Sequence, residues 1–299
     1  MNRLTSRKME WSWDDLPILL PLAFEAREWN AVYTAFYLAE STGSLVRILH
    51  VKTGDDEPER RAQYLDRLKD FSSNLKVTFK LEDVQSREPF PSISEIAESI
   101  VQKSEEFSCG SIVMSAHRED FFTELFGRIS DRVARTAKCR VVLVETPKAG
   151  LQIPKNPSKI LIPALEEELD PEPFILAGAL TSSASVPNVE ILVTKIVQLP
   201  PSVPLDAVNV PEIFRREEQE FSSAIGSYIQ SLGRFLTPRI LPVRRIGQDV
   251  ATYATDLGVD MIILSSRKTG HRSLLPKNGY EIVSRAPCIS LVVVARRTS

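Results

Sequence analysis

The sequence has few of the residues that build metal sites and disulfide frameworks. Among 299 residues there are only three cysteines and three histidines, and no C-x-x-C pair occurs. The cysteines are Cys109, Cys139 and Cys288, and each lies within or beside an apolar, strand-like run. We therefore expect buried, reduced thiols rather than a disulfide framework or a zinc site. The scattered histidines form no metal-ligand set.

An excess of one charge and long apolar runs are also missing. The 37 basic and 39 acidic residues give a net charge of −2, so no overall field draws the chain to nucleic acid or to an anionic membrane. No apolar run approaches the roughly 18–20 residues that cross a bilayer, and the N-terminus contains no apolar core of a signal peptide. We expect a cytoplasmic protein with no nucleic-acid partner and no membrane insertion.

Motifs of several large enzyme classes are absent as well. The sequence contains no G-x-S-x-G, H-E-x-x-H, G-x-G-x-x-G or P-loop lysine motif, and no nucleophile–base pair stands out. We therefore expect a protein that is not an enzyme and has no catalytic residue.

Short β-rich runs alternate with helical patterns along the whole chain. The predicted strands cover 18–22, 45–51, 76–81, 111–115, 140–144, 159–163, 189–197, 239–243, 261–265 and 290–294. Helical patterns lie around 29–36, 57–75, 93–101, 120–137, 171–183, 212–236 and 250–257, and Ser92 with Glu95 forms the sequence pattern of a capping box. Apolar strands separated by helices indicate an α/β fold with a parallel sheet covered on both faces, in doubly wound form.

The two halves of the chain repeat this order. The runs 18–21 and 160–163, 111–115 and 261–265, and 137–144 and 286–293 correspond, at offsets near one domain length. Residues 147–158 contain three prolines and a glycine and have little periodicity. We expect an N-terminal tail at 1–15, a first domain at 16–146, a linker at 147–157 and a second domain at 158–299.

Three motifs in each half resemble the universal stress protein family. The opening strands resemble its I-L-V-P-V-D, the fourth strands its D-L-I-V-M-G, and the ends of both halves its G-S-V-S-E-R-V-x-x-x-A-P-C-P-V-L-V-V, carried here by Gly127 to Val133 with Ala137 to Val141, and by Tyr280 to Ile289. The resemblance implies two tandem five-stranded parallel sheets with strand order 3-2-1-4-5. Many members of this family bind ATP through G-x-x-G, nine residues and then G-S or G-T, because glycines let backbone amides approach phosphates.

The chain departs from this nucleotide motif in both halves. In the first, Ser115 is followed by Ala116, His117 and Arg118, and only Gly127 survives, next to Arg128. In the second, Pro276-Lys277 stands where the final Gly-Ser is expected, and a proline donates no amide. The acidic residue after the first strand is replaced by Ala23 and by Leu165. We therefore expect no particular cofactor; ATP or another nucleotide is the alternative.

The candidate binding residues lie at the ligand ends of the two predicted sheets. They are Ser265, Arg267, Lys268, Gly270, His271, Arg272 and Lys277 in the second half, and His117, Arg118, Gly127 and Arg128 in the first. The cations of the second half form either an anion site, in which charge replaces the lost amides, or a solvated loop. Those of the first half form either a ligand site or a surface turn.

Three further features lie outside these motifs, and the last two each leave two alternatives. His50 ends a predicted strand near the mouth of the expected cleft, with no metal partner in view. An acidic cluster follows the first strand of the second half: Glu166, Glu167, Glu168 and Asp170. These residues either chelate a cation or stabilise the N-terminus of the following helix by interacting with its dipole. Trp11 and Trp13 form either an anchor at a membrane interface or a segment that packs on the domain or on a partner chain.

Three hypotheses about function follow. The first is a non-enzymatic, stress-associated regulatory or scaffolding protein that binds an unknown protein partner. The resemblance implies that its halves pack as an intramolecular pseudo-dimer through the edges Arg140 to Val144 and Ser290 to Val294, and such pairing would cover two apolar sheet edges. A homodimer is a further possible assembly. The second is a nucleotide-binding sensor that uses mainly the second half. The third is the soluble regulatory unit of a membrane transporter.

Overall fold

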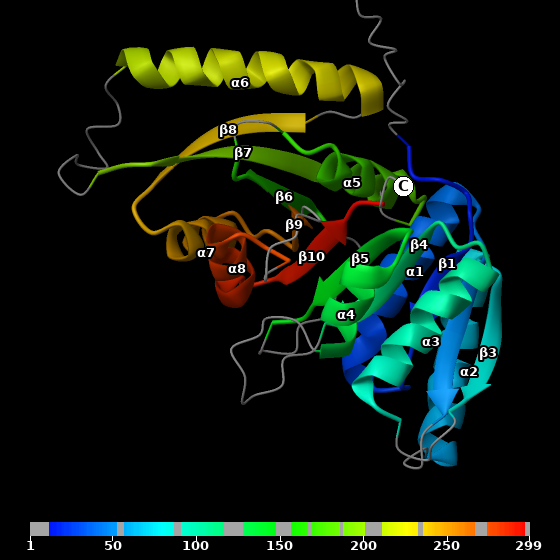
Figure 1. The fold of residues 1–299 in the computed structure, drawn as a ribbon. Helices are drawn as coiled ribbons and strands as arrows, with labels where there is room; N and C mark the ends of the chain where they lie inside the picture. Colours follow the sequence, from blue (N-terminus) through cyan, green and yellow to red (C-terminus); the bar gives the residue numbers. More distant parts are fainter. Residues whose placement is uncertain are drawn as a thin grey trace, which may run out of the picture.

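The computed structural model describes residues 12–52, 57–86, 91–116, 128–147, 157–166, 169–185, 188–200, 211–232, 236–266 and 274–296. The first half contains β1 (Ile18–Pro21), the 3-10 helix η1 (Ala26–Glu28), α1 (Trp29–Thr42), β2 (Val46–Lys52), α2 (Pro58–Leu75), β3 (Phe79–Gln85), α3 (Ile93–Glu106), β4 (Ser111–Ala116), α4 (Arg128–Thr136) and β5 (Arg140–Glu145). The second contains β6 (Lys159–Ala164), α5 (Glu172–Ser182), β7 (Glu190–Gln198), α6 (Pro211–Leu232), β8 (Leu236–Val243), α7 (Ile246–Asp256), β9 (Met261–Ser266), α8 (Lys277–Arg285) and β10 (Ile289–Val294). Figure 1 shows their arrangement.

All the strands belong to one ten-stranded sheet of order β3-β2-β1-β4-β5-β10-β9-β6-β7-β8. Within each half the strands are parallel and follow the predicted order 3-2-1-4-5. The halves meet where β5 and β10 run antiparallel, with Val142 opposite Val293. The two five-stranded sheets expected from the sequence are thus present, and they are continuous with each other.

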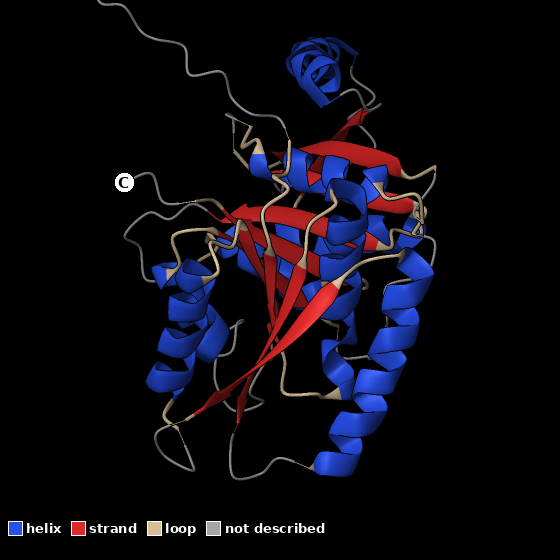
Figure 2. Ribbon diagram, turned by 90° about the vertical axis from the view of Figure 1, so that its right-hand side faces the viewer, coloured by secondary structure: helices blue, strands red, loops and turns tan. Residues whose placement is uncertain are grey.

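Among the described residues, four α-helices cover each face of this sheet. On one face, α1, α2, α5 and α6 bury a shared core whose largest fully buried side chains include Phe36 and Phe174. On the other, α3, α4, α7 and α8 bury a second core. Figure 2 shows the twisted strands between these helices. Because both faces are covered, almost every strand residue in the centre of the sheet is buried, which explains the apolar runs in the sequence.

Contacts between α1 and α5 join the two halves on the first face. The Glu40 carboxylate of α1 accepts hydrogen bonds from the Ser183 hydroxyl, and from the Ser185 hydroxyl at 2.8 Å. Asn30 of α1 donates to the Thr146 hydroxyl at 2.8 Å. The Glu40 hydrogen bonds thus link the two halves, whereas the Asn30 bond holds α1 to the end of β5 within the first half.

Some predicted boundaries were wrong. β3 begins at Phe79 rather than at 76, because Lys76 adopts a left-handed conformation (φ 56°) that ends α2, and the Ser72 hydroxyl then donates to the Val77 carbonyl. β8 begins at Leu236, where the sequence pattern predicted helix. The helix start predicted at 120 stays untested, because it lies outside the described residues, which resume at Arg128 in α4.

Other local expectations were confirmed. Ser92 caps α3 by accepting the backbone N–H of Glu95 at 3.2 Å, although the Glu95 carboxylate is bonded to the Ser86 hydroxyl. The three cysteines are buried and free, and burial raises the pKa of Cys109 and of Cys288 to about 12. Such thiols are unreactive at neutral pH.

Two prolines interrupt the outer edge of the second half. The Val243 carbonyl of β8 accepts the N–H of Leu199, which follows β7. Because backbone groups alternate in direction along a strand, the odd-numbered residues of β8 point their N–H and C=O groups toward β7, and the even-numbered residues point theirs away from the sheet. Pro238 and Pro242 are both even-numbered, and neither has an N–H to offer. These prolines protect the edge from aggregation.

Candidate functional site

In a doubly wound sheet, ligands bind at the carboxyl ends of the strands where the strand order reverses. In the first half this point lies between the ends of β1 and β4, and in the second between the ends of β6 and β9. The side chains that surround these two points decide what each half can bind.

Phe24 is buried beside the end of β1, on the side of β2 and α2. This side chain is only 2% exposed, and its backbone is in the left-handed region at φ 60°. Its ring lies 4.7 Å from the His50 ring and 5.5 Å from the Tyr64 ring, between centroids, and the Arg61 guanidinium lies 5.2 Å from its centroid. A non-glycine residue at positive φ is strained, so the packing of the ring has to outweigh that strain.

Glu28 holds the loop that carries Phe24. Its carboxylate accepts the N–H of Ala23 at 3.0 Å and the N–H of Glu25 at 2.9 Å. The side chain is buried, and burial raises the pKa of its carboxyl from 4.5 to about 7, while the two backbone hydrogen bonds oppose the rise. The chain therefore supplies its own carboxylate to the amide groups that follow the first strand.

His50 ties the ends of β1 and β2 together. Its Nδ1 lies 2.9 Å from the carbonyl oxygen of Leu22, so Nδ1 carries the proton and donates. The ring is buried. The histidine that the sequence places near the cleft is thus a structural link within this closed end.

In the second half, two leucines pack beside the end of β9, in the core on the other face of the sheet. Leu274 and Leu275, immediately before α8, are both buried. The Ser266 hydroxyl, at the end of β9, donates to the Leu274 carbonyl and holds this segment against the sheet. Pro276 then occupies the N-cap position of α8, where it has no N–H to offer an anion.

Leu165 closes the same position from the end of β6. A Cβ added to Gly279 in α8 would lie 3.5 Å from Leu165 Cδ1 and 3.4 Å from Leu275 Cδ2. Leu165 stands where the family motif carries an acidic residue, and it belongs to the apolar core on this face. Apolar side chains thus converge on the start of the helix where phosphate would be expected.

Comparison with known proteins now identifies the first half. The sequence profile of the Universal stress protein family matches residues 17–145. The first half of the chain is thus similar in sequence to this family. The resemblance seen in the motifs is confirmed, and the same universal stress protein fold recurs in the second half.

Solved structures with this tandem fold cover nearly the whole chain. A functionally unknown protein from Pseudomonas aeruginosa is 14% identical with a TM-score of 0.59, and the alignment covers 94% of this chain and 92% of that one. A universal stress protein from Archaeoglobus fulgidus is 14% identical with a TM-score of 0.58, covering 97% and 99%. The cytoplasmic domain of a prokaryotic cation chloride cotransporter is 13% identical with a TM-score of 0.52, covering 94% and 96%. At these identities the similarity establishes the fold, and none of the curated protein sequences compared matches this chain.

Only three of the predicted binding residues lie in the described part of the universal stress protein fold. Ser265 is half-buried in β9, while Lys277 and Arg128 are exposed at the first positions of α8 and α4. The hydrogen bond from Ser266 to Leu274 holds the end of β9, which carries Ser265, near the start of α8, which carries Lys277. The other predicted residues, His117, Arg118, Gly127, Arg267, Lys268, Gly270, His271 and Arg272, lie outside the described residues.

The acidic cluster after β6 has a helix-capping member. Asp170 accepts the N–H of Glu172 at 3.0 Å, at the first turn of α5. Glu166 is exposed, and Glu167 and Glu168 lie outside the described residues. Across the described residues no group of three or more potential metal ligands converges. Asp170 therefore fits the capping alternative.

Reasoning from sequence missed the residues that close the two sites. Phe24 and Glu28 gave a weak signal, because the spacing from Glu25 to Glu28 is that of a reciprocal cap at a helix start. Leu274 and Leu275 are an apolar pair between a loop and a helix, a place where polar residues are more usual. Both sequence patterns become informative only if an apolar residue near the expected ligand site is considered as a side chain that occupies part of that site.

Proposed function

We propose that this chain is a non-enzymatic regulatory or binding protein of the universal stress protein type, whose family nucleotide sites are closed by its own side chains. The observation that carries the proposal is the filling of both strand ends: Phe24 and Glu28 in the first half, and Leu165, Leu274 and Leu275 in the second. A phosphate needs several backbone N–H donors and little bulk. In this chain the Glu28 carboxylate already accepts two of the amides that follow β1, and leucines pack near Gly279 at the start of α8.

The proposal extends to the assembly of the two halves. The antiparallel pairing of β5 and β10, with the contacts between α1 and α5, buries the edge that would otherwise associate with another chain. We infer that the two domains, with a boundary near 147–157, act as a pseudo-dimer within one cytoplasmic chain. Its function would then lie in binding a protein partner or a small ligand outside the family's nucleotide position.

Calorimetry tests the proposal directly. The full chain, purified and then denatured, should release no adenine absorbance at 260 nm. Titration with Mg-ATP should give no binding heat up to about 1 mM ATP, which corresponds to a binding free energy weaker than roughly −4 kcal/mol. Binding with a micromolar Kd in either half would favour the alternative of a nucleotide sensor and reject this proposal.

A second candidate is a regulatory unit of a membrane transporter. The similarity to the cytoplasmic domain of a cation chloride cotransporter favours it, because the alignment covers nearly all of both chains. Within the described residues, no helix is both long and apolar enough to cross a bilayer, so a transporter would have to be a separate partner or a longer chain. Affinity capture from detergent-solubilised membranes should then recover a multispanning protein; capture of none would count against this candidate.

A further inference from the structure

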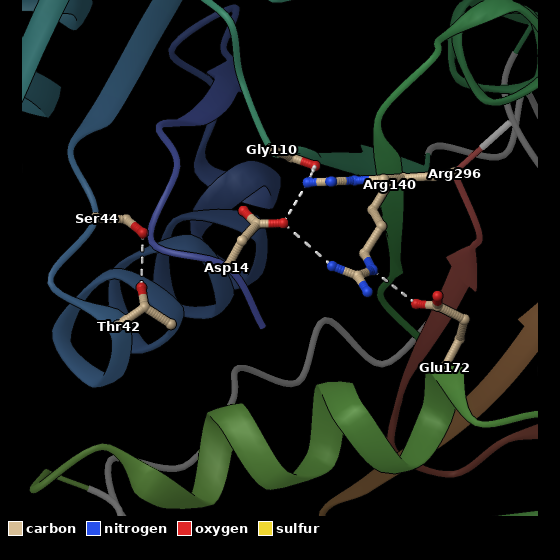
Figure 3. Close-up of polar contacts among 7 residues, drawn as sticks. All are labelled: Asp14, Thr42, Ser44, Gly110, Arg140, Glu172 and Arg296. Atoms are coloured by element: carbon tan, nitrogen blue, oxygen red, sulfur yellow. Dashed lines mark hydrogen bonds and ion pairs between the residues drawn. The ribbon is translucent and has the colours of Figure 1, made fainter. Parts of the chain in front are cut away.

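Asp14 connects the two halves and the two ends of the described chain. Its Oδ2 accepts from Arg140 Nη1, at the start of β5, at 3.2 Å, and from the Arg296 guanidinium just after β10. Arg140 also donates through Nε to Glu172 of α5 at 2.9 Å. Figure 3 shows these side chains around one point. A residue that precedes β1 is thus paired with cations from both halves.

The residues around Asp14 fit closely against the sheet. Trp13 is only 6% exposed, and the Arg140 guanidinium lies 5.1 Å from its ring centroid. The N–H of Gly110 donates to the Pro17 carbonyl at 2.9 Å, and the Gly110 carbonyl accepts from Arg296 at 3.3 Å. Trp13 therefore packs on the domain, one of the two alternatives drawn from the sequence, whereas Trp11 lies outside the described residues.

Gly110 is required for this arrangement. A Cβ at Gly110 would lie 1.9 Å from Asp14 Oδ1 and 2.8 Å from Leu16 Cβ, which no side chain can tolerate without displacing residues 12–16. In the second half, Asp260 precedes β9 as Gly110 precedes β4, and its carboxylate accepts the N–H of Ser158 at 2.6 Å. The first half thus has a glycine where the second has an aspartate, and Asp14 occupies the space that the glycine leaves.

From this geometry we propose that residues 12–17 form a strap that Asp14 fastens across the seam and that can be released by weakening its ion pairs. The charges of this cluster are only partly exposed: 11% for Arg140, 20% for Asp14, 14% for Glu172 and 43% for Arg296. Pairs of this kind contribute more than exposed pairs but are still screened by salt through the exposed member. Release would uncover Trp13, Arg140 and the end of β10, and would loosen the attachment between the halves.

Fluorine NMR of the full chain labelled with 5-fluorotryptophan tests the strap. The Trp13 signal, assigned by its loss in Trp13→Phe, should show little solvent isotope shift in the wild type. Loss of charge-assisted hydrogen bonds in Asp14→Asn should raise the exposed population of Trp13 roughly 10- to 100-fold. Gly110→Ala should do the same without changing any charge, and 1 M NaCl should raise exposure in the wild type but much less in Asp14→Asn.

Asp15→Asn is the matched control, because it removes the same charge from the neighbouring exposed residue. Arg296→Gln provides a milder test, since it leaves the pair between Arg140 and Glu172 intact, and its Trp13 exposure should lie between wild type and Asp14→Asn. A Trp13 signal that stays buried in Asp14→Asn and Gly110→Ala would overturn the proposal. Equal exposure of Trp13 in Asp15→Asn and Asp14→Asn would overturn it as well.

Discussion

The Glu28 carboxylate accepts the backbone N–H of Ala23, five residues earlier, and so fastens the loop that places Phe24 at the end of β1. The same carboxylate is buried and bonded to a second amide, that of Glu25. An ionisable group in this position makes the closed end of the first half sensitive to pH.

Glu28 should make the folded state less stable as pH rises from about 4.5 to about 7. Burial raises the pKa of its carboxyl from 4.5 to about 7, so between these values the folded chain holds a proton that the unfolded chain has lost, and stability falls with rising pH. Between pH 5 and pH 8, the free energy of unfolding measured with urea should fall by roughly 2–3 kcal/mol more in the wild type than in Glu28→Gln.

Glu59→Gln provides the control for this titration, because Glu59 is exposed on α2. Its pH dependence should follow that of wild type. If Glu28→Gln and wild type changed in parallel over the same pH range, Glu28 would not titrate near 7 in the folded chain.

Leu275→Ala should destabilise the second half. Leu275 is 3% exposed and packs near Gly279 of α8, so its removal leaves a cavity that costs about 2–5 kcal/mol. Chemical denaturation monitored by circular dichroism measures this loss. Leu241→Ala, on the edge strand β8 and only partly buried, should cost less; an equal or smaller loss for Leu275→Ala would mean that this leucine does not fill the site.

Glu40→Ala should weaken the contact between the two halves. It removes the carboxylate that accepts hydrogen bonds from the Ser183 and Ser185 hydroxyls at the end of α5. We expect the free energy of unfolding to fall by about 1–3 kcal/mol. Thermal unfolding gives the change, and Glu59→Ala serves as the comparison on an exposed helix surface. Unchanged stability in Glu40→Ala would show that this pair contributes nothing to the seam.

Replacing Pro238 and Pro242 together by threonine should increase self-association. Each threonine restores an N–H on the outward side of β8, which creates a longer pairing edge. Light scattering of the concentrated double variant at 37 °C should rise several-fold above wild type. Thr237→Val, whose N–H faces β7, should not change it, and a double variant that stays as soluble as wild type would contradict the protective role.

Much of the fold could be predicted from local sequence patterns. The apolar runs of β1, β4 and β5 and their repeats in β6, β9 and β10 reflect burial on both faces of the sheet, a property that each strand records in its own residues. The pairing of β5 with β10 was expected from the family resemblance, and it covers two apolar, β-branched strands that would otherwise be sheet edges. Boundaries such as that of β3 depend on one left-handed residue, Lys76, and were placed wrongly.

The closed sites could not be predicted in the same way, because they depend on contacts between distant residues. Nothing local to Phe24 reveals its positive φ or its contact with Tyr64, forty residues later in the chain. The partners Asp14 and Arg296 are separated by 282 positions. The sequence did reveal the lost glycines, and the structure adds the side chains that occupy the space.

The most direct test of the central claim is a crystal structure grown in saturating Mg-ATP. We expect no nucleotide density at the carboxyl ends of β1 and β4 or of β6 and β9, and we expect Phe24, Leu274 and Leu275 to remain buried. A triphosphate bound at either end, with these side chains displaced, would contradict it.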